Sequence, residues 1–468
     1  MARRRILILG AGGRDFHDFN VVFRDDPDVE VVAITAAQIP NIDERVYPPS
    51  LSGPNHPEGI PIRPQDELER LVAEHGVDEV VVSYSDLAHV DVMHLVSRVL
   101  TTGADVRLLG PTNTMLRSDT PVIAVVASRT GVGKSQTSRH LGRLLTEAGL
   151  RVALVRHPMP YGDLERMRVQ RFATLAEIDA ADPTIEEREE YEEPVRRGLV
   201  IYAGVDYAEI LARAGDEADV IIWDGGNNDL SFFRPDLTIC LTDALRPGHE
   251  LGYHPGEVNL RLADIVVINK VDSADPAAVA TIRSNVAAVN PTATVIEARS
   301  PVTLDPGPSL AGARVLVVED GPTVTHGGMP FGAGVVAARA HGATDLIDPR
   351  PWAVGQIAET FERYPQIGTL LPAMGYGDRQ LADLEATLQA IPCDVVVTGT
   401  PIDLGHVIDP GHPVRHARYD YADAGTPTLA DVLQPLIEQL RRGTGDRRPS
   451  SPNPGHQANG ATRETGPP

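Results

Sequence analysis

Short apolar runs recur along the chain, and most of them end in a polar or glycine-containing turn. Runs of this length and character are typical of buried parallel strands. Stretches of helical length separate them, so the pattern predicts an α/β fold. The expected strands are Arg5–Leu9, Val29–Ile34, Glu79–Ser83, Asp105–Leu109, Ile123–Ala127, Arg151–Val155, Asp219–Trp223, Leu237–Leu241, Ile265–Ile268, Thr294–Glu297, Arg314–Val318 and Val395–Thr398.

A chain of 468 residues is long enough for two or three domains. We expect a Rossmann-like, substrate-binding domain over 1–118 and a P-loop NTPase domain with a mostly parallel sheet over 119–304. A C-terminal α/β region should follow over 305–440. The segment 441–468 is rich in Gly, Pro, Ser, Asn and Arg, a composition that predicts a disordered tail.

The segment following Ile123–Ala127 has the order of a P-loop unit. The turn Ser128–Ser135 (SRTGVGKS) follows the strand, and Gln136–Ala148 is a predicted helix. Backbone N–H groups of such a turn, together with the helix N-terminus, bind phosphates. Ser128 occupies the position of the motif's first glycine. The expected nucleotide-binding residues are Gly131, Val132, Gly133, Lys134, Ser135 and Gln136.

The distribution of lysine supports this assignment. Among 42 Lys and Arg residues only Lys134 and Lys270 are lysines, and both fall in nucleotide motifs. Lys270 belongs to Asn269-Lys270-Val271-Asp272, the Asn-Lys-x-Asp form of a loop that reads a nucleotide base. We expect Asn269, Lys270 and Asp272 to contact the nucleotide. An Asn-Lys-x-Asp loop usually selects guanine, so GTP stays open beside ATP.

Two oxygen-bearing side chains are candidates for Mg²⁺. The Ser135 hydroxyl takes the usual P-loop position, and Asp224 ends an apolar strand downstream of the P-loop. Lys134, Asp224, Arg129 and Arg156 are the expected catalytic residues.

Candidate substrate ligands follow several of the predicted strands. They are Arg14, His17, Arg156, His157, Arg171, Arg246 and His249. Arg14 is either a ligand contact or the partner of a local carboxylate. The turn before it begins like a dinucleotide motif, but Asp15 replaces the last glycine, and no acidic residue ends the second strand. An acidic run, 186–193, reads as a solvated helical face, with metal or substrate contact as the minority alternative.

Composition narrows the class of protein. A net charge of −23 and 4% aromatic residues argue against a nucleic-acid binder and favour a soluble cytoplasmic protein. No apolar stretch is long enough for a membrane span. Cys240 and Cys393 lie in separate apolar segments, which indicates reduced core residues.

Taken together, these segments resemble the cyclic 2,3-diphosphoglycerate synthetase family, within the dimer-forming P-loop NTPases. The segments are GRDFHDFN (13–20), SRTGVGKSQTSRH (128–140), RHPMPYGDL (156–164), TIEEREEYE (184–192), YAGVDY (202–207), WDGGNND (223–229), RPGHE (246–250) and NKVD.

The resemblance implies an ATP-dependent ligase that phosphorylates 2,3-diphosphoglycerate and closes it to a cyclic phosphoanhydride, releasing ADP and phosphate. The P-loop domain would hold ATP and Mg²⁺, and the N-terminal domain would help bind the small phosphorylated acid. A homodimer is implied as well. Arg129 aligns with a P-loop lysine that reaches the partner's nucleotide in such dimers, and contact with the acceptor within its own subunit is the alternative. A regulatory or chaperone-like GTPase acting on a protein partner is the rival function.

Overall fold

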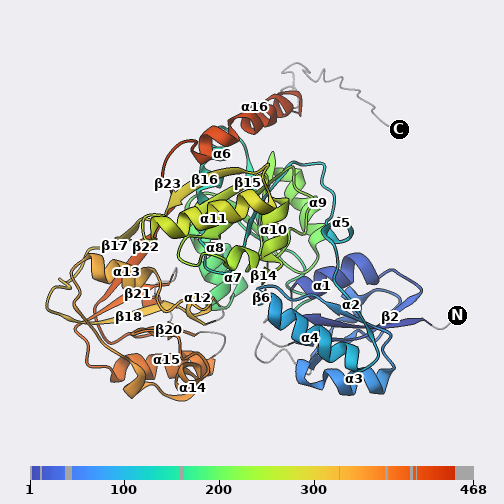
Figure 1. The fold of residues 1–468 in the computed structure, drawn as a ribbon, viewed down its shortest axis with the longest axis horizontal. Coiled ribbons are helices and arrows are strands. Elements are labelled where there is room, and N and C mark those ends of the chain that lie inside the picture. The colour runs from blue at the N-terminus through green and yellow to red at the C-terminus, as the bar shows by residue number, and fades with distance from the viewer. Residues whose placement is uncertain are drawn as a thin grey trace, which may run out of the picture.

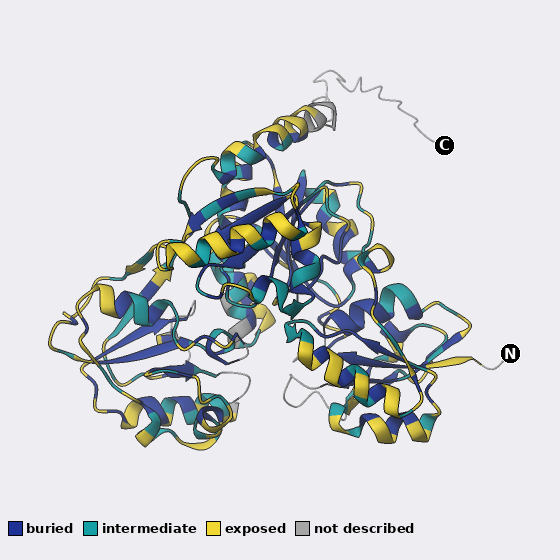
Figure 2. Cartoon of the chain, viewed as in Figure 1, coloured by how far each residue is buried: buried dark blue, intermediate teal, exposed yellow. Residues whose placement is uncertain are grey.

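The computed structural model describes residues 3–10, 13–36, 45–157, 163–325, 327–374, 378–400, 404–406 and 408–447. It shows three α/β units, each built on its own sheet, and Figure 1 shows the second unit lying between the other two. In all three units buried strands lie beneath helices with exposed outer faces (Figure 2). None of the described helices has both the length and the hydropathy that crossing a membrane requires.

The N-terminal domain contains a sheet with the strand order β3-β4-β2-β1-β5-β7. Its parallel part, β4-β2-β1-β5-β7, follows the 3-2-1-4-5 order of a Rossmann-like fold, as expected. Its strands are β1 (Arg4–Gly10), β2 (Val29–Ala36), β3 (Val46–Tyr47), β4 (Ile60–Pro64), β5 (Glu79–Val82) and β7 (Asp105–Arg107). Its helices are α1 (Arg14–Asp18), α2 (Pro49–Ser52), α3 (Leu68–His75), α4 (His89–Thr101) and α5 (Pro111–Thr114).

The central domain has a nine-stranded sheet in the order β10-β11-β9-β12-β8-β13-β15-β16-β23, parallel except at its two edge pairs. Its strands are β8 (Val122–Ala127), β9 (Val152–Arg156), β10 (Gln170–Phe172), β11 (Val200–Ala203), β12 (Val220–Asp224), β13 (Leu237–Asp243), β15 (Ile265–Asn269), β16 (Thr294–Arg299) and β23 (Ala422–Asp423). Its helices are α6 (Lys134–Glu147), α7 (Leu175–Ala181), α8 (Ile185–Arg196), α9 (Tyr207–Glu217), α10 (Gly256–Leu262), α11 (Pro276–Val289) and α16 (Leu429–Arg447).

The third domain has a smaller sheet, β17-β22-β21-β18-β19, with β20 also paired to β18. Its strands are β17 (Val302–Leu304), β18 (Arg314–Asp320), β19 (Asp345–Leu346), β20 (Leu371–Ala373), β21 (Val395–Gly399) and β22 (Val414–Tyr419). Its helices are α12 (Gly321–Val324), α13 (Ala333–Ala340), α14 (Gly355–Arg363) and α15 (Asp378–Ala390). The described strands confirm the mixed α/β class and the twelve predicted strands, with bounds shifted by a residue or two.

The end of the chain departs from the expected domain division. After the third domain, β23 pairs with β16, and α16 packs on one face of the central core through Leu429, Leu433 and Ile437. The region 305–440 is therefore not one unit, because its last part completes the central domain. The helix also runs to Arg447, into the predicted tail, while 448–468 lie outside the described residues.

A small two-stranded sheet joins the first two domains. Strand β6 (Leu87–Ala88) of the N-terminal domain pairs with β14 (Tyr253–His254), which follows the short helix η3 (His249–Leu251) of the central domain. This pairing holds the carboxyl-end face of the N-terminal sheet against the central domain, so polar loops of both meet there.

Candidate active site

The P-loop forms as the sequence predicts, between β8 and α6. Gly131 and Gly133 have φ angles of +76° and +99°, and a Cβ on Gly133 would overlap the Asn269 side-chain amide. Glycine is therefore required at Gly133 for both conformation and space. Ser128 is not among the described residues with positive φ, so its position does not need the glycine of the general motif.

Lys134, Asp224 and Arg156 form one buried ionic cluster beside the P-loop. Lys134 Nζ lies 3.0 Å from Asp224 Oδ1, and Arg156 Nη1 donates to Asp224 Oδ2. Arg156 also pairs with Glu190 on α8, a member of the predicted acidic run. Burial opposes the negative charge of Asp224, but Arg156 and Lys134 outweigh it and hold the pKa of this carboxyl below its ordinary value. Asp224 is thus ionised at neutral pH.

The predicted Mg²⁺ ligands lie close together. Arg156 Nη1 donates to Ser135 Oγ at 3.3 Å as well as to Asp224, so the hydroxyl and the carboxylate share one donor. A hydroxyl and a carboxylate are the hard oxygen ligands that Mg²⁺ takes beside nucleotide phosphates, so the residues fit this ion. No described group of three or more His, Cys, Asp and Glu side chains is arranged to hold a metal by itself. A bound Mg²⁺ would neutralise phosphate charge during phosphoryl transfer.

The Asn269–Asp272 loop holds the P-loop through hydrogen bonds to its backbone. The Asn269 amide donates to Val132 O at 2.8 Å, and Lys270 Nζ donates to Gly131 O at 2.6 Å and pairs with Asp243. Asp272 accepts from the backbone N–H of Ser300 at 3.2 Å and does not line the pocket described below. Asn269 and Lys270, two of the three residues predicted to contact the nucleotide, therefore bind the backbone of the P-loop.

Arg129 connects the P-loop to both neighbouring domains. Its Nε donates to Asp86 of the N-terminal domain at 2.8 Å, its Nη1 lies 3.0 Å from His249 Nδ1, and its guanidinium stacks on Tyr253 at 3.6 Å. Its Nη2 donates to Gly327 O of the third domain at 3.4 Å.

Arg246, in the central domain, also links the P-loop to the third domain. It pairs with Asp243 and donates to Thr130 O at 2.8 Å and to Gly327 O at 2.7 Å. In this structure Arg246 and His249 therefore contact protein groups, not an open phosphate site.

Arg14, His17 and His157 meet where the N-terminal and central domains touch. His17 is buried, stacks on Phe232 at 3.9 Å and contacts Thr114 O at 2.6 Å. Burial lowers the pKa of His17 to about 3, so it is neutral and serves packing. His157 lies 3.5 Å from Asp229, and Arg14 lies 3.5 Å from Asp18. The local carboxylate partner considered for Arg14 is therefore present.

Arg171 is the predicted ligand that lies apart from the rest. It is on the edge strand β10, where it pairs with Glu217 on α9 at 2.8 Å, and its side chain is partly exposed. It does not line the pocket. Its position supports a surface ion pair, not substrate contact.

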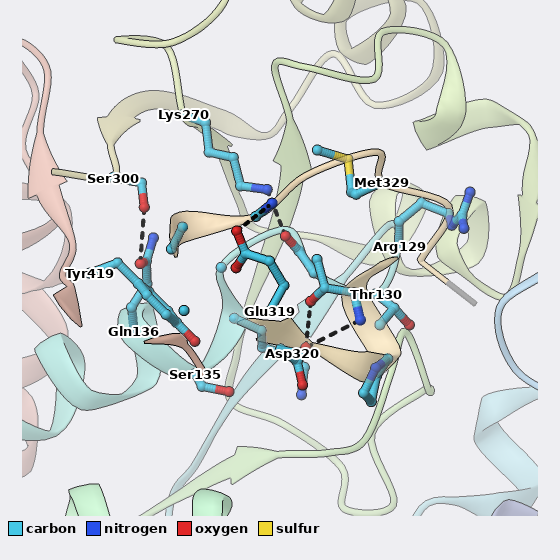
Figure 3. A pocket seen from close by; sticks show the side chains of 18 of the residues that line it. Arg129, Thr130, Ser135, Gln136, Lys270, Ser300, Glu319, Asp320, Met329 and Tyr419 are labelled. Carbon is cyan, nitrogen blue, oxygen red and sulfur yellow. Dashed lines mark hydrogen bonds between the residues drawn. The ribbon is translucent and has the colours of Figure 1, made fainter. Parts of the chain in front are cut away.

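A pocket of about 270 Å³ lies between the P-loop and the third domain (Figure 3). The central domain contributes Lys134, Ser135, Arg156, Asp224 and neighbouring P-loop groups. The opposite wall comes from the end of β18, from α12 and from the segment after it, and it includes Glu319, Asp320, Thr323, Met329 and Phe331.

The acids of that wall were not predicted from the sequence. Glu319 accepts backbone N–H groups of Gly332, Gly334 and Val335, yet burial raises its pKa to about 7. Asp320 accepts from Thr323, and burial raises its pKa too. Their position at the end of the apolar run Val315–Val318 is the one signal that the sequence offered.

Comparison with known proteins assigns the family. No family model matches the chain. The "Arginine synthetase ArcE" of Thermococcus kodakarensis is 55% identical over 432 residues, which cover 92% of this chain and 96% of that protein. The chain belongs to the family of this arginine synthetase. The predicted ligase class agrees with the synthetase name of the relative, whereas diphosphoglycerate as acceptor is not shown.

Solved structures resemble the chain only loosely. LpxK from Aquifex aeolicus in complex with ATP aligns with a TM-score of 0.40 at 14% identity, covering 75% of this chain and 95% of that one. A ParA family ATPase from Chlorobium tepidum covers 39% of this chain and 84% of its own, with a TM-score of 0.24 at 13% identity. Likenesses this loose do not bear on function.

Proposed function

We propose that the protein is an ATP-dependent synthetase that forms the guanidino group of arginine from the ureido group of citrulline. Citrulline is the amino acid that differs from arginine by one oxygen in place of one nitrogen at the terminal carbon. That oxygen is a poor leaving group until it is phosphorylated. ATP, citrulline and ammonia would give ADP, phosphate and arginine.

Two steps achieve this balance. The ureido oxygen attacks the γ-phosphorus of ATP and displaces ADP, giving a phosphorylated isourea. Ammonia then adds to its carbon, the C–O bond breaks with loss of phosphate, and a proton is released from the nitrogen. Lys134 and the P-loop N–H groups suit the first step, because phosphoryl transfer depends chiefly on positioning and on stabilising charge.

The observation that carries the proposal is the charge distribution in the pocket. Four of the five cationic side chains that line it already have a carboxylate partner: Arg129 with Asp86, Lys134 and Arg156 with Asp224, and Lys270 with Asp243. The fifth, Arg139, donates to Tyr419 O at 3.5 Å. The wall opposite the P-loop carries the acids Glu319 and Asp320. A neutral ureido group or a cationic guanidinium suits this wall, whereas a second polyanion beside ATP would meet carboxylates. The name of the relative agrees.

Cyclisation of 2,3-diphosphoglycerate is the second candidate, and the motif resemblance favours it. Both candidates begin with phosphoryl transfer from ATP to an oxygen of a small acceptor, so the P-loop cluster serves either. Magnesium at Ser135 and Asp224 belongs to both proposals. The homodimer stays a prediction, as does cytoplasmic localisation.

One assay separates the candidates. The purified protein is given ATP or GTP and Mg²⁺ with either citrulline and ammonium or 2,3-diphosphoglycerate, and ³¹P NMR and mass spectrometry follow the products. Citrulline labelled with ¹⁸O in the ureido group should give unlabelled arginine and phosphate carrying ¹⁸O. Lys134→Ala is the control and should give neither product.

Each other outcome has a definite meaning. A cyclic phosphoanhydride formed only from 2,3-diphosphoglycerate would replace the proposal with the second candidate. Hydrolysis of GTP that neither acceptor stimulates would favour the regulatory GTPase. Arginine formed without ¹⁸O in phosphate would refute activation of the ureido oxygen.

A further inference from the structure

Four charged or titratable side chains gather where the N-terminal and central domains meet, outside the pocket described above. We call Arg14, Asp18, His157 and Asp229 the interdomain cluster. Arg14 and Asp18 are on α1, shortly after β1, His157 follows β9, and Asp229 lies in the loop after β12. These are the carboxyl ends of parallel strands from two sheets, the places where α/β proteins bind ligands.

The cluster is buried and only partly paired internally. Arg14, Asp18 and Asp229 are 6%, 0% and 4% exposed. Arg14 Nε lies 3.5 Å from Asp18 Oδ2, and the Ser83 hydroxyl donates to the same oxygen at 2.8 Å. Asp229 Oδ2 lies 3.5 Å from His157. Asp18 and Asp229 are close enough that the charge of Asp229 adds to burial in raising the pKa of Asp18.

In the cluster, Arg14, Asp18 and Asp229 each have one buried atom with no hydrogen-bond partner among the described residues: Arg14 Nη1, Asp18 Oδ1 and Asp229 Oδ1. Buried polar atoms are nearly always satisfied, and leaving charged ones unsatisfied is costly. One unsatisfied atom is a cationic donor and two are carboxylate acceptors. A phosphate would satisfy the donor but would meet two carboxylates, and a simple cation would meet Arg14.

We infer that the interdomain cluster binds the head group of an α-amino acid, with Arg14 on the carboxylate and Asp18 and Asp229 on the ammonium. A zwitterion is the ligand class that supplies an acceptor for Arg14 and donors for both acids. The inference rests on the proposed function, and it gives the N-terminal domain the task of holding the amino-acid end of the substrate.

The loop that carries Asp229 also contacts the P-loop. The Asn228 amide donates to Ser128 O at 3.1 Å, and the Thr130 hydroxyl donates to Asn227 Oδ1 at 3.2 Å. A head group held by Asp229 is therefore one short loop away from the phosphate cradle. Citrulline and arginine have four-bond side-chain spacers, so the head group and the reacting group can lie in neighbouring sites.

Truncated ligands test the inference by isothermal titration calorimetry. Agmatine is arginine without the carboxylate, and 5-guanidinopentanoate is arginine without the ammonium. The wild-type protein should bind arginine at least tenfold more tightly than either, because charge-assisted hydrogen bonds are lost with each group. Arg14→Gln should weaken arginine binding about tenfold to hundredfold and agmatine binding less than threefold. Asp229→Asn should weaken arginine and agmatine but spare 5-guanidinopentanoate.

Arg151→Ala is the matched control, because Arg151 is exposed and pairs with Asp219 at the opposite end of β9. ATP affinity and circular dichroism report folding, and Arg14→Lys, which keeps the charge, replaces any variant that fails to fold. Agmatine bound as tightly as arginine by the wild-type protein would overturn the inference, as would equal losses for all three ligands in the variants. A wild-type protein that neither binds arginine nor makes it from citrulline fails the proposed function; one that makes arginine without this ligand selectivity fails only the inference.

Discussion

Replacing Gly13 with alanine should damage the junction of the N-terminal and central domains. A Cβ at this position would overlap Cε1 and Nε2 of the His157 ring. The φ angle of Gly13 is −148°, so the substitution acts through this overlap and not through a left-handed backbone. The ring must move, although it contacts Asp229 at 3.5 Å and Phe232 edge-on at 5.6 Å.

The size of the effect follows from overpacking. Inserting a methyl group into a well-packed site costs about 1–3 kcal/mol, because side chains are forced from their preferred positions. If that cost falls on the acceptor-bound state, kcat/KM for the acceptor should drop roughly fivefold to 150-fold. The affinity for ATP should change less than about twofold, because the P-loop strand and helix are untouched.

The assay measures kcat/KM for the acceptor at saturating ATP and the Kd of ATP by calorimetry. Gly110→Ala is the control, because a Cβ there meets nothing within 4 Å and the φ of −76° suits alanine. Wild-type kcat/KM in Gly13→Ala would show that the acceptor does not depend on this junction. An equal loss of ATP affinity would show that the two sites are not separate.

Three further predictions concern the pocket and the Asn269–Asp272 loop beside it. Lys134→Ala should lower kcat at least 10²-fold and keep the circular dichroism spectrum, because the lysine stabilises the transferring phosphoryl group; near wild-type kcat in stopped assays contradicts the P-loop assignment. Asp272→Asn keeps an acceptor for the Ser300 backbone N–H and should leave the ATP/GTP preference unchanged, whereas Asp272→Ala should raise the nucleotide KM. A switch of nucleotide preference in steady-state kinetics of the Asn variant would show that Asp272 reads the base. The pKa of Glu319 is about 7 in the folded protein and 4.5 in the unfolded chain, so raising the pH through this window should lower the unfolding free energy by about 3 kcal/mol. Glu319→Gln should flatten the dependence of the unfolding free energy on pH, measured by calorimetry from pH 5 to 8. The exposed Glu359→Gln is its control, and an unchanged slope in Glu319→Gln would refute the assignment.

Features encoded by local order were predictable. The apolar runs became the strands, and the P-loop needed only the order of strand, turn and helix. Ser135 and Asp224 were predicted as Mg²⁺ ligands because the P-loop hydroxyl and an acid that ends a later apolar strand usually take these positions. The possible pairing of Arg14 was also readable, since Asp18 is four residues away on a helix.

Pairings between distant segments were not predictable. Arg156 looked like an available phosphate ligand, but it stands directly opposite Asp224 in the β9–β12 register, and the sequence does not give that register. The acids of β18 enter the pocket only because the third domain folds against the P-loop. Packing of His17 on Phe232 likewise depends on domain contact, which no local pattern describes.

The return of α16 to the central domain has a consequence for synthesis. Leu429, Leu433 and Ile437, with Tyr421 and Leu440 beside them in the chain, join a core whose remaining members lie between Ile123 and Ala298 and are made much earlier by the ribosome. The nascent central domain thus leaves an apolar face open while the whole third domain is translated. A chain cut short after β22 would keep that face exposed, a surface that chaperones and proteases recognise. Translation through helix α16 is therefore a condition for a closed central domain.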